Sequence, residues 1–324
     1  MSDLLPLLNG LDFSDCRVLL LGDLVLDRFV FGTTRRISRE APIPVVQYAG
    51  ESLAPGGAAN AAANLASLGA QVSVAGLIGA DVAGNELLGC LADLGVETSL
   101  ARVANDRPTT VKTRFFAGGA GTVRQQVLRL DHEPHGGVAT DDSEALASAV
   151  AGAAHRFDVL VLSDYGYGAV DPGLITRVGD LPVVVDSRMQ LRRFVGAHTL
   201  KPNLSELEQV VGRDLDDEDD IAAAAQDLRS AAKAGAVLVT LGRDGMLLAE
   251  ASGVRKVPVF GDDEIADVTG AGDSVLAAFA ASIGRGLDRF DAARIATVAG
   301  AVAVNHHGTH AVRLDELNQA LKHG

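Results

Sequence analysis

The residues with the clearest chemical potential stand in one glycine-rich turn, residues 267–274, which reads Asp-Val-Thr-Gly-Ala-Gly-Asp-Ser. An apolar stretch follows directly and predicts a helix that begins inside the turn. The amides of Gly270, Ala271 and Gly272 would then open a helix, where N–H groups lack intrahelical acceptors and attract anions. Asp273 would lie beside that anion, which repels a carboxylate, so we interpret it as a general base. The turn alone fits an ordinary helix N-cap at least as well.

A second group of candidate residues lies near the amino terminus. Gly56 and Gly57 let the backbone approach a ligand without a Cβ, and Asn60 follows one helical turn later with a donor and an acceptor. Asp27 follows the first expected strand, at the edge where ligands bind in open α/β sheets. Each signal is weak alone, and a surface turn is the alternative for Asp27. Together they suit a ligand with several hydroxyl groups.

Two further motifs follow strands in the second half of the chain. Residues 201–206 read Lys-Pro-Asn-Leu-Ser-Glu, which places Asn203 and Glu206 three residues apart where a helix is expected to begin. Glu206 can hold water on Mg²⁺, although a capping box is the alternative. Residues 240–245 read Thr-Leu-Gly-Arg-Asp-Gly, and their two glycines suit either nucleotide phosphates or a hairpin turn.

The elements that carry these motifs alternate along the chain. Short apolar runs predict strands, and alanine-rich segments bounded by capping residues and glycines predict helices between them. This order predicts a doubly wound, mostly parallel sheet with helices on both faces, within a single domain spanning residues 1–324. Residues 29–48 and 109–130 interrupt the alternation, because they are rich in β-branched, aromatic and arginine residues, and they predict a small β-sheet lid. The acidic run at 214–220 predicts a helix start.

Composition limits the partners of the protein. The chain has 324 residues, 48% of them hydrophobic, so it can bury a full core. Its formal net charge of −14 argues against nucleic-acid and anionic-membrane partners, which select basic surfaces. Cys16 and Cys90 are typical of buried small residues in a reducing cytoplasm, and no apolar run reaches the roughly 18 residues of a membrane span. We therefore expect a cytoplasmic protein.

The motifs together resemble one family. The turn at 267–274 resembles the carboxy-terminal signature of the ribokinase-like (PfkB) carbohydrate kinases, and Gly-Gly-Ala-Ala-Asn at 56–60 resembles their amino-terminal signature. The segments at 22–27, 162–165, 201–206 and 240–245 follow in the same order, so the resemblance runs from about residue 18 to about 310. No P-loop motif and no Gly-x-Gly-x-x-Gly after the first strand competes with it.

The resemblance implies a role for each motif. Asp273 would be the catalytic base beside an anion hole of Gly270, Ala271 and Gly272, with a monovalent cation such as K⁺ near Asp267. ATP and Mg²⁺ would be required, with Asn203 and Glu206 reaching the metal through water. The sugar would contact Asp27, Gly56, Gly57 and Asn60, and ATP would contact Lys201, Asn203, Leu204, Ser205, Glu206, Thr240, Gly242 and Gly245.

Two lid segments narrow the expected substrate. Residues 36–46 and 124–131 resemble the lid of the D-glycero-D-manno-heptose 7-phosphate kinases, which phosphorylate the anomeric hydroxyl. Arg36, Arg124 and Arg129 are candidates for the sugar phosphate, because the guanidinium binds phosphate bidentately; surface ion pairs are the alternative. The chain departs from that group at Arg39, where a proline is usual, and at Tyr167 and Arg188, where lysines are usual.

Other functions stay open at this stage. A kinase of fructose, ribose or a nucleoside would use the same signatures, and a non-catalytic sugar or nucleotide sensor could keep the fold. No adenylyltransferase domain, as appended in bifunctional heptose kinases, is expected in this chain.

The lid and a histidine group give two further expectations. A small sheet with free edges is marginal alone, so we expect a homodimer through an apolar lid face of Ile43, Val45, Phe115 and Val127. His306, His307 and His310 suggest a metal, but no cysteine or second histidine cluster completes a closed site, so none is expected there.

Overall fold

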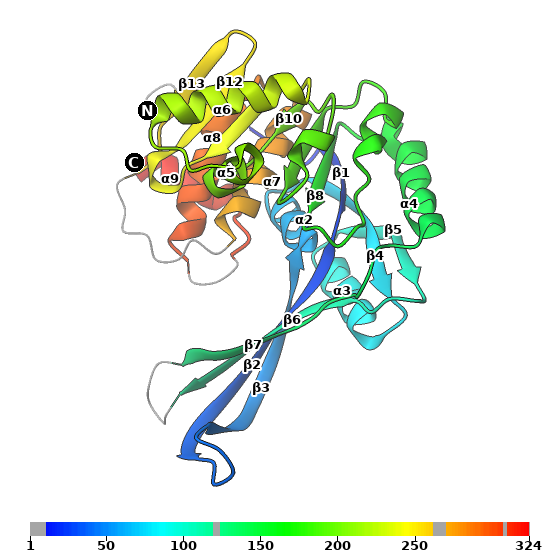
Figure 1. Ribbon diagram of the computed structural model, residues 1–324, viewed down its shortest axis with the longest axis vertical. Coiled ribbons are helices and arrows are strands. Elements are labelled where there is room, and N and C mark those ends of the chain that lie inside the picture. Colours follow the sequence, from blue (N-terminus) through cyan, green and yellow to red (C-terminus); the bar gives the residue numbers. More distant parts are fainter. Residues whose placement is uncertain (1–10, 119–123, 262–269, 307–309, 324) are drawn as a thin grey trace.

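The main body is built on a nine-stranded sheet in a computed structural model, which describes residues 11–118, 124–261, 270–306 and 310–323 (Figure 1). The strand order is β13-β12-β11-β10-β9-β8-β1-β4-β5, and every pairing is parallel except those of β12 with β11 and β13. The strands are β1 (Arg17–Gly22), β4 (Gln71–Gly79), β5 (Glu97–Ala104), β8 (Val159–Asp164), β9 (Val183–Ser187), β10 (Thr199–Leu200), β11 (Ala236–Thr240), β12 (Met246–Glu250) and β13 (Gly253–Val257).

Helices cover both faces of this sheet, because successive side chains of β1 point alternately into two different hydrophobic cores. Val18 and Leu20 belong to the core formed with α2, α3, α7, α8 and α9, whereas Leu19 and Leu21 belong to the core formed with α4, α5 and α6. The predicted doubly wound architecture is therefore confirmed. The helices are α2 (Ala58–Ser67), α3 (Val82–Asp93), α4 (Thr140–Ala153), α5 (Leu204–Val211), α6 (Glu218–Ala231), α7 (Ala271–Gly284), α8 (Arg289–Val304) and α9 (Leu314–His323).

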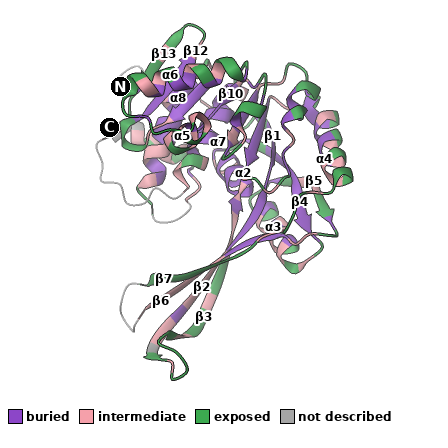
Figure 2. Cartoon of the chain, in the orientation of Figure 1, coloured by how far each residue is buried: buried purple, intermediate pink, exposed green. Residues whose placement is uncertain are grey.

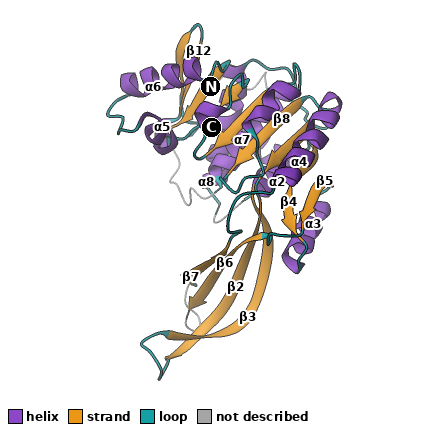
Figure 3. Ribbon diagram, turned by 45° about the vertical axis from the view of Figure 1, so that its right-hand side comes forward, coloured by secondary structure: helices purple, strands orange, loops and turns teal. Residues whose placement is uncertain are grey.

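A second sheet projects from the body as a lid (Figures 1 and 3). Its order is β3-β2-β6-β7, formed by β2 (Leu24–Ile37), β3 (Pro44–Gly57), β6 (Thr110–Gly118) and β7 (Gln125–His132). The first two strands are longer than the sequence predicted. They begin and end inside the body, because β2 starts two residues after β1 and β3 ends where α2 begins. Asp27 therefore lies within a strand at the root of the lid, not in a surface turn.

The ladder of the lid sorts its side chains onto two faces. Lys112 is opposite both Asp27 and Asp131, and Arg114 is opposite Arg129, so these side chains share one face. Phe115 is opposite Leu128, on the other face. A register shift between Phe115 and Phe116 removes Val127 from this alternation, because Val127 has no partner across the ladder. The ladder places Phe115, Leu128 and Leu130 on one apolar face, and the place of Val127 on that face stays a prediction.

Several local elements differ from the predicted alternation. The acidic run does begin a helix, since Asp217 is the N-cap of α6 and accepts a hydrogen bond from the Asp220 amide. The start of α5 was expected at Asn203, and a hairpin turn was one of two interpretations of residues 240–245, whereas β13 and α9 were not predicted because their apolar patterns are too short to identify from sequence. Among the described residues, no helix is long and apolar enough to span a bilayer.

Candidate active site

The carboxylate of Asp273 is held at the amino terminus of α7. Gly270 precedes the helix with a φ of 82°, a left-handed conformation that glycine adopts without strain. Ala271 and Gly272 are the first two helical residues, so their amides have no acceptor within the helix. A Cβ on Gly272 would meet no atom of the described residues within 4 Å. The geometry is that of an anion site with a carboxylate one residue away.

Two side chains from distant elements hold the Asp273 carboxylate. Asn60 of α2 donates from Nδ2 to Oδ2 at 2.6 Å, and Tyr165, which follows β8, donates its hydroxyl to Oδ1 at 3.3 Å. Burial raises the pKa of Asp273 to about 6, Asp186 contributes in the same direction, and the two hydrogen bonds and Lys201 oppose it. A carboxylate with this pKa is ionised at neutral pH yet basic enough to accept a proton.

A buried ion pair lies close to the Asp273 carboxylate. The ammonium of Lys201 is 2.9 Å from Oδ2 of Asp186, and the Lys201 side chain is almost wholly buried. Burial alone would lower the pKa of Lys201, but Asp186, Glu206 and Asp273 outweigh it, and the net pKa is raised. Burial raises the pKa of Glu206, and the charge of Asp186 raises it further. Asp186 was missed from the sequence, although it ends a buried strand as the other candidates do.

The predicted nucleotide motifs meet at the ends of neighbouring strands. Asn203 accepts from the Glu206 amide at 2.8 Å and Glu206 accepts from the Asn203 amide at 2.9 Å, which is a capping box at the start of α5. Leu204 and Ser205 are the first two residues of that helix. Thr240 of β11 forms a parallel bridge with Asn203. Asn203 and Glu206 therefore do form the capping box that was the alternative interpretation. The other carboxylate oxygen, Oε1 of Glu206, makes no hydrogen bond to any described residue.

Gly242 and Gly245 form the turn between β11 and β12. Leu241 donates its amide to the Gly245 carbonyl, and Gly245 donates to that of Gly242. A Cβ on Gly245, whose φ is 83°, would lie 2.3 Å from the carbonyl oxygen of Val257. The hairpin alternative therefore explains this glycine, whereas Gly242 has open space around it.

The candidate sugar residues meet where the lid joins the body. Asp27 is buried and accepts from Nη1 of Arg114 at 2.6 Å. A Cβ on Gly56 would lie 2.6 Å from Oδ2 of Asp27, so only glycine allows this carboxylate its position. Gly57 has a φ of 55°, and its Cβ would lie 2.8 Å from the Asp23 carbonyl oxygen. Gly57 is the N-cap residue of α2, which carries Asn60, so Gly56, with Asp27 against it, lies at the end of the strand that leads into the Asn60–Asp273 contact.

Asp23 was not singled out from the sequence, yet it shapes this region. Its buried carboxylate accepts from the amides of Tyr165, Tyr167 and Ala169 at 2.8 to 3.0 Å. Burial raises its pKa, against these three hydrogen bonds. Asp23 therefore fixes the loop that presents Tyr165 to Asp273. Its place directly after the first strand was the available signal.

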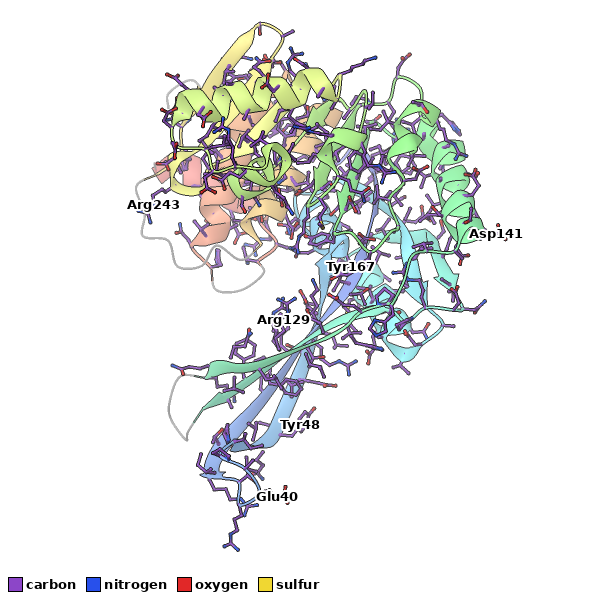
Figure 4. All side chains as sticks on the ribbon, in the orientation of Figure 1. Glu40, Tyr48, Arg129, Asp141, Tyr167 and Arg243 are labelled. Atoms are coloured by element: carbon purple, nitrogen blue, oxygen red, sulfur yellow. The ribbon has the colours of Figure 1, made fainter. Side chains whose placement is uncertain are left out.

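The three predicted phosphate arginines are not brought together. Arg36 is nine residues beyond Asp27 along β2, or about 30 Å at the usual strand rise. Arg124 stacks on the Phe31 ring, further out on the lid than Asp27. Arg129 is bound to Asp131 through two hydrogen bonds of 2.6 and 2.7 Å near the root of the lid. Figure 4 shows Arg129 and Tyr167 where the lid leaves the body. Asp267 lies outside the described residues.

In the structure the carboxylate of Glu316 lies beside His306 and His310. The rings of His306 and His310 are stacked at 3.7 Å, and Nε2 of His310 is 3.0 Å from the carboxylate of Glu316 on α9. Ligand atoms of the three side chains lie within 4.8 Å of one another. The same carboxylate accepts the Arg313 amide, so it also anchors the start of α9. His307 lies outside the described residues.

Comparisons with known proteins agree with this geometry. A family model described as pfkB family carbohydrate kinase matches residues 21–153 and 173–316. The chain is 43% identical over 317 residues to a bifunctional protein HldE of Halorhodospira halophila and 39% identical over 316 residues to that of Mesorhizobium japonicum. These alignments cover 96% and 95% of this chain but only 65% and 62% of the relatives. The chain thus spans less than two thirds of their length.

Solved structures show the same fold at low identity. Escherichia coli phosphofructokinase-2 in complex with potassium superposes with a TM-score of 0.77 at 22% identity, covering 95% of this chain and 98% of that one. Arabidopsis thaliana ribokinase complexed with ribose and ATP gives a TM-score of 0.72 at 20% identity, covering 95% and 98%. These similarities establish the ribokinase-like fold.

Proposed function

Because the chain belongs to the pfkB family of carbohydrate kinases, we propose that it transfers the γ-phosphoryl group of ATP to D-glycero-D-manno-heptose 7-phosphate at the anomeric hydroxyl. The single observation that supports the chemistry is Asp273, a base with a pKa of about 6 beside an open helix amino terminus. The heptose assignment rests on the similarity to HldE proteins. A sensor that had lost catalysis would have no use for an ionisable group in this position.

In the proposed mechanism Asp273 takes the proton of the sugar hydroxyl as that oxygen attacks the γ-phosphorus. Asn60 and Tyr165 hold the carboxylate in orientation through their hydrogen bonds. The amides of Gly270, Ala271 and Gly272 stabilise the charge on the transferring group, because preorganised donors need no rearrangement during the reaction. Asp27 is suited to accept hydrogen bonds from other sugar hydroxyls, and it is already fixed by Arg114 and Gly56.

The nucleotide side has a charge arrangement that suits Mg²⁺. Burial raises the pKa of Glu206, the charge of Asp186 raises it further, and a divalent cation would offset both effects by stabilising the carboxylates. Asn203 and Glu206 would hold the ion through water, and it would neutralise charge on the nucleotide phosphates. Lys201, paired with Asp186, would add a fixed positive charge, and Leu204, Ser205, Thr240, Gly242 and Gly245 would border the nucleotide.

A monovalent-cation requirement and a dimer complete the proposal. The potassium complex of Escherichia coli phosphofructokinase-2 motivates a test of K⁺ dependence near Asp267. For the lid, Ile37, Ile43, Tyr48, Leu128 and Leu130 are all more than half exposed, and Figure 2 shows how much of the lid surface lies open. A second copy related by a two-fold axis would cover this apolar surface.

A substrate panel tests the proposed function directly. ATP consumption would be measured with heptose 7-phosphate, fructose 6-phosphate, ribose, fructose and adenosine, and the product of the best substrate would be identified by phosphorus NMR. We expect heptose 7-phosphate to give the highest kcat/KM and a 1,7-bisphosphate product. A preference for an unphosphorylated sugar would refute the heptose assignment and leave the kinase activity standing.

A further inference from the structure

The lid root holds a buried cation with no acidic partner. Lys112 on β6 is only 7% exposed, yet its ammonium forms no ion pair or hydrogen bond with any described residue. It lies instead over two aromatic rings, 5.8 Å from the centroid of Tyr165 and 5.6 Å from that of Tyr167. Two neighbouring basic residues do have acidic partners, since Arg114 forms an ion pair with Asp27 and Arg129 forms one with Asp131.

A second unpaired cation lies against the same tyrosine. The guanidinium of Arg188, just after β9, is 4.3 Å from the Tyr165 ring centroid and forms no ion pair within the described chain. Burial lowers the pKa of Lys112, and the charges of Arg188 and Arg129 lower it further, against Asp131 and Asp27. The cations are thus close enough to repel one another.

This arrangement is unfavourable without an anion. The chain carries 42 acidic and 28 basic residues, so carboxylates are abundant, yet none is paired with Lys112 or Arg188 in the described structure. A buried ammonium costs free energy unless a counter-charge compensates it. Arg188 is exposed, so this cost falls on Lys112, and a buried unpaired ammonium with a second cation at the same ring indicates a site whose counter-ion arrives with a ligand.

The position of the cations relative to the base identifies the part of the ligand that they meet. The hydroxyl of Tyr165 touches Asp273, whereas Lys112 and Arg188 lie at its ring. Both cations therefore lie beside the tyrosine that binds the Asp273 carboxylate, and among the described residues neither forms an ion pair with that carboxylate. Asp27, for which we propose contacts with sugar hydroxyls, is directly opposite Lys112 in the ladder. An anion here belongs to the acceptor sugar, at the end remote from the reacting hydroxyl.

We propose that Lys112 and Arg188 form the subsite for a phosphomonoester already present on the acceptor sugar, with Tyr165 and Tyr167 as the platform that holds the two cations. This inference rests on the proposed sugar-phosphate kinase function and makes it more specific. It locates phosphate recognition at the root of the lid within one subunit, and not at Arg36 or Arg124 further along it. Glu133, which accepts from the Tyr167 hydroxyl at 2.5 Å, fixes the platform from the segment after β7.

The test compares two matched substitutions. Lys112→Met removes the charge and keeps the long apolar stem. Lys256→Met makes the same change on β13, where the lysine is half exposed and pairs with Glu218. Steady-state kinetics would be measured for both variants and the wild type with heptose 7-phosphate and with unphosphorylated heptose. Inhibition by inorganic phosphate against the sugar substrate gives a second reading.

We expect Lys112→Met to raise KM for the phosphorylated sugar about 10- to 100-fold, the loss of one charge-assisted contact, with KM for ATP unchanged. Unphosphorylated heptose should be used equally by wild type and variant, and phosphate inhibition should weaken in the variant alone. Arg188→Ala should act in the same direction. A merely structural role for Lys112 would instead impair both sugars alike and lower the melting temperature.

The outcomes separate this inference from the proposed function. If the wild type uses heptose 7-phosphate and Lys112→Met is unaffected, the subsite is misplaced and the function stands. If the variant loses affinity for ATP and not for the sugar, the cations serve the nucleotide and the inference is overturned. If the wild type prefers fructose 6-phosphate, the heptose assignment fails, and the same variant series on that substrate still decides the subsite.

Discussion

Replacing Asp273 by asparagine should abolish catalysis and stabilise the protein at the same time. In the folded state burial raises the pKa of this carboxyl to about 6, against an ordinary value of 3.8. That difference corresponds to about 3 kcal/mol, because each factor of ten in acidity is worth 1.36 kcal/mol. A raised pKa favours folding only while the group is protonated. Its contribution is therefore complete below pH 3.8 and lost as the pH rises through 6.

The expected sign follows from this linkage. At pH 8 the wild type has an ionised, desolvated carboxylate, so Asp273→Asn should increase the free energy of unfolding by up to about 3 kcal/mol. The gain should fall to about half at pH 5 and nearly vanish at pH 4. Above the pKa of Asp273, turnover should drop by a factor of about 100 or more, because the amide cannot accept the proton, and the difference should narrow below pH 6, where the wild-type carboxylate is itself protonated.

The assay is chemical denaturation followed by circular dichroism, since the chain has no tryptophan. Asp141→Asn, an exposed acidic residue in the first turn of α4 that is labelled in Figure 4, is the matched control and should show no comparable gain. An Asp273→Asn variant that is less stable than the wild type at pH 8, or one that retains turnover, would refute the reasoning. The first outcome would show that the carboxylate is a structural cap, and the second that it is not the base.

Three other predictions concern the surroundings of the base, the sugar region and the lid. Asn60→Ala removes a 2.6 Å hydrogen bond from ionised Asp273, so the acid limb of the kcat profile should move up from about pH 6 by about one pH unit or more; an unmoved limb would contradict this role. Gly56→Ala should displace Asp27 and raise KM for the sugar at least about tenfold. The control is Gly152→Ala, because Gly152 is an exposed helical glycine with free space around it. This variant should leave KM unchanged and add about 0.5–1 kcal/mol to the free energy of unfolding. Light scattering should show a dimer for the wild type and a monomer for Val45→Asp, and a fully active monomeric wild type would show that the lid needs no partner.

The sequence determined the architecture because its signals are local. Short apolar runs between capped helices require a parallel sheet that is buried on both faces, and Val18 to Leu21 indeed divide between two cores. The glycine-rich turn before Asp273 could be predicted for the same reason, because a left-handed glycine and a helix start depend only on neighbouring residues. Gly56 and Asn60 could be proposed, but their physical roles could not be assigned.

Only the tertiary structure decided which charges meet. The Asn60 amide reaches Asp273 across 213 positions of sequence, and Lys112 from the lid meets Arg188 from the body at one tyrosine ring. The pKa of Asp273 depends on burial, on Asp186 of β9 and on Lys201, which directly follows β10. No periodicity in the chain encodes such contacts, because they arise where β-strands and helices from remote segments converge at one edge of the sheet. The sequence therefore predicted Asp273 as the base, and the fold showed which residues surround it.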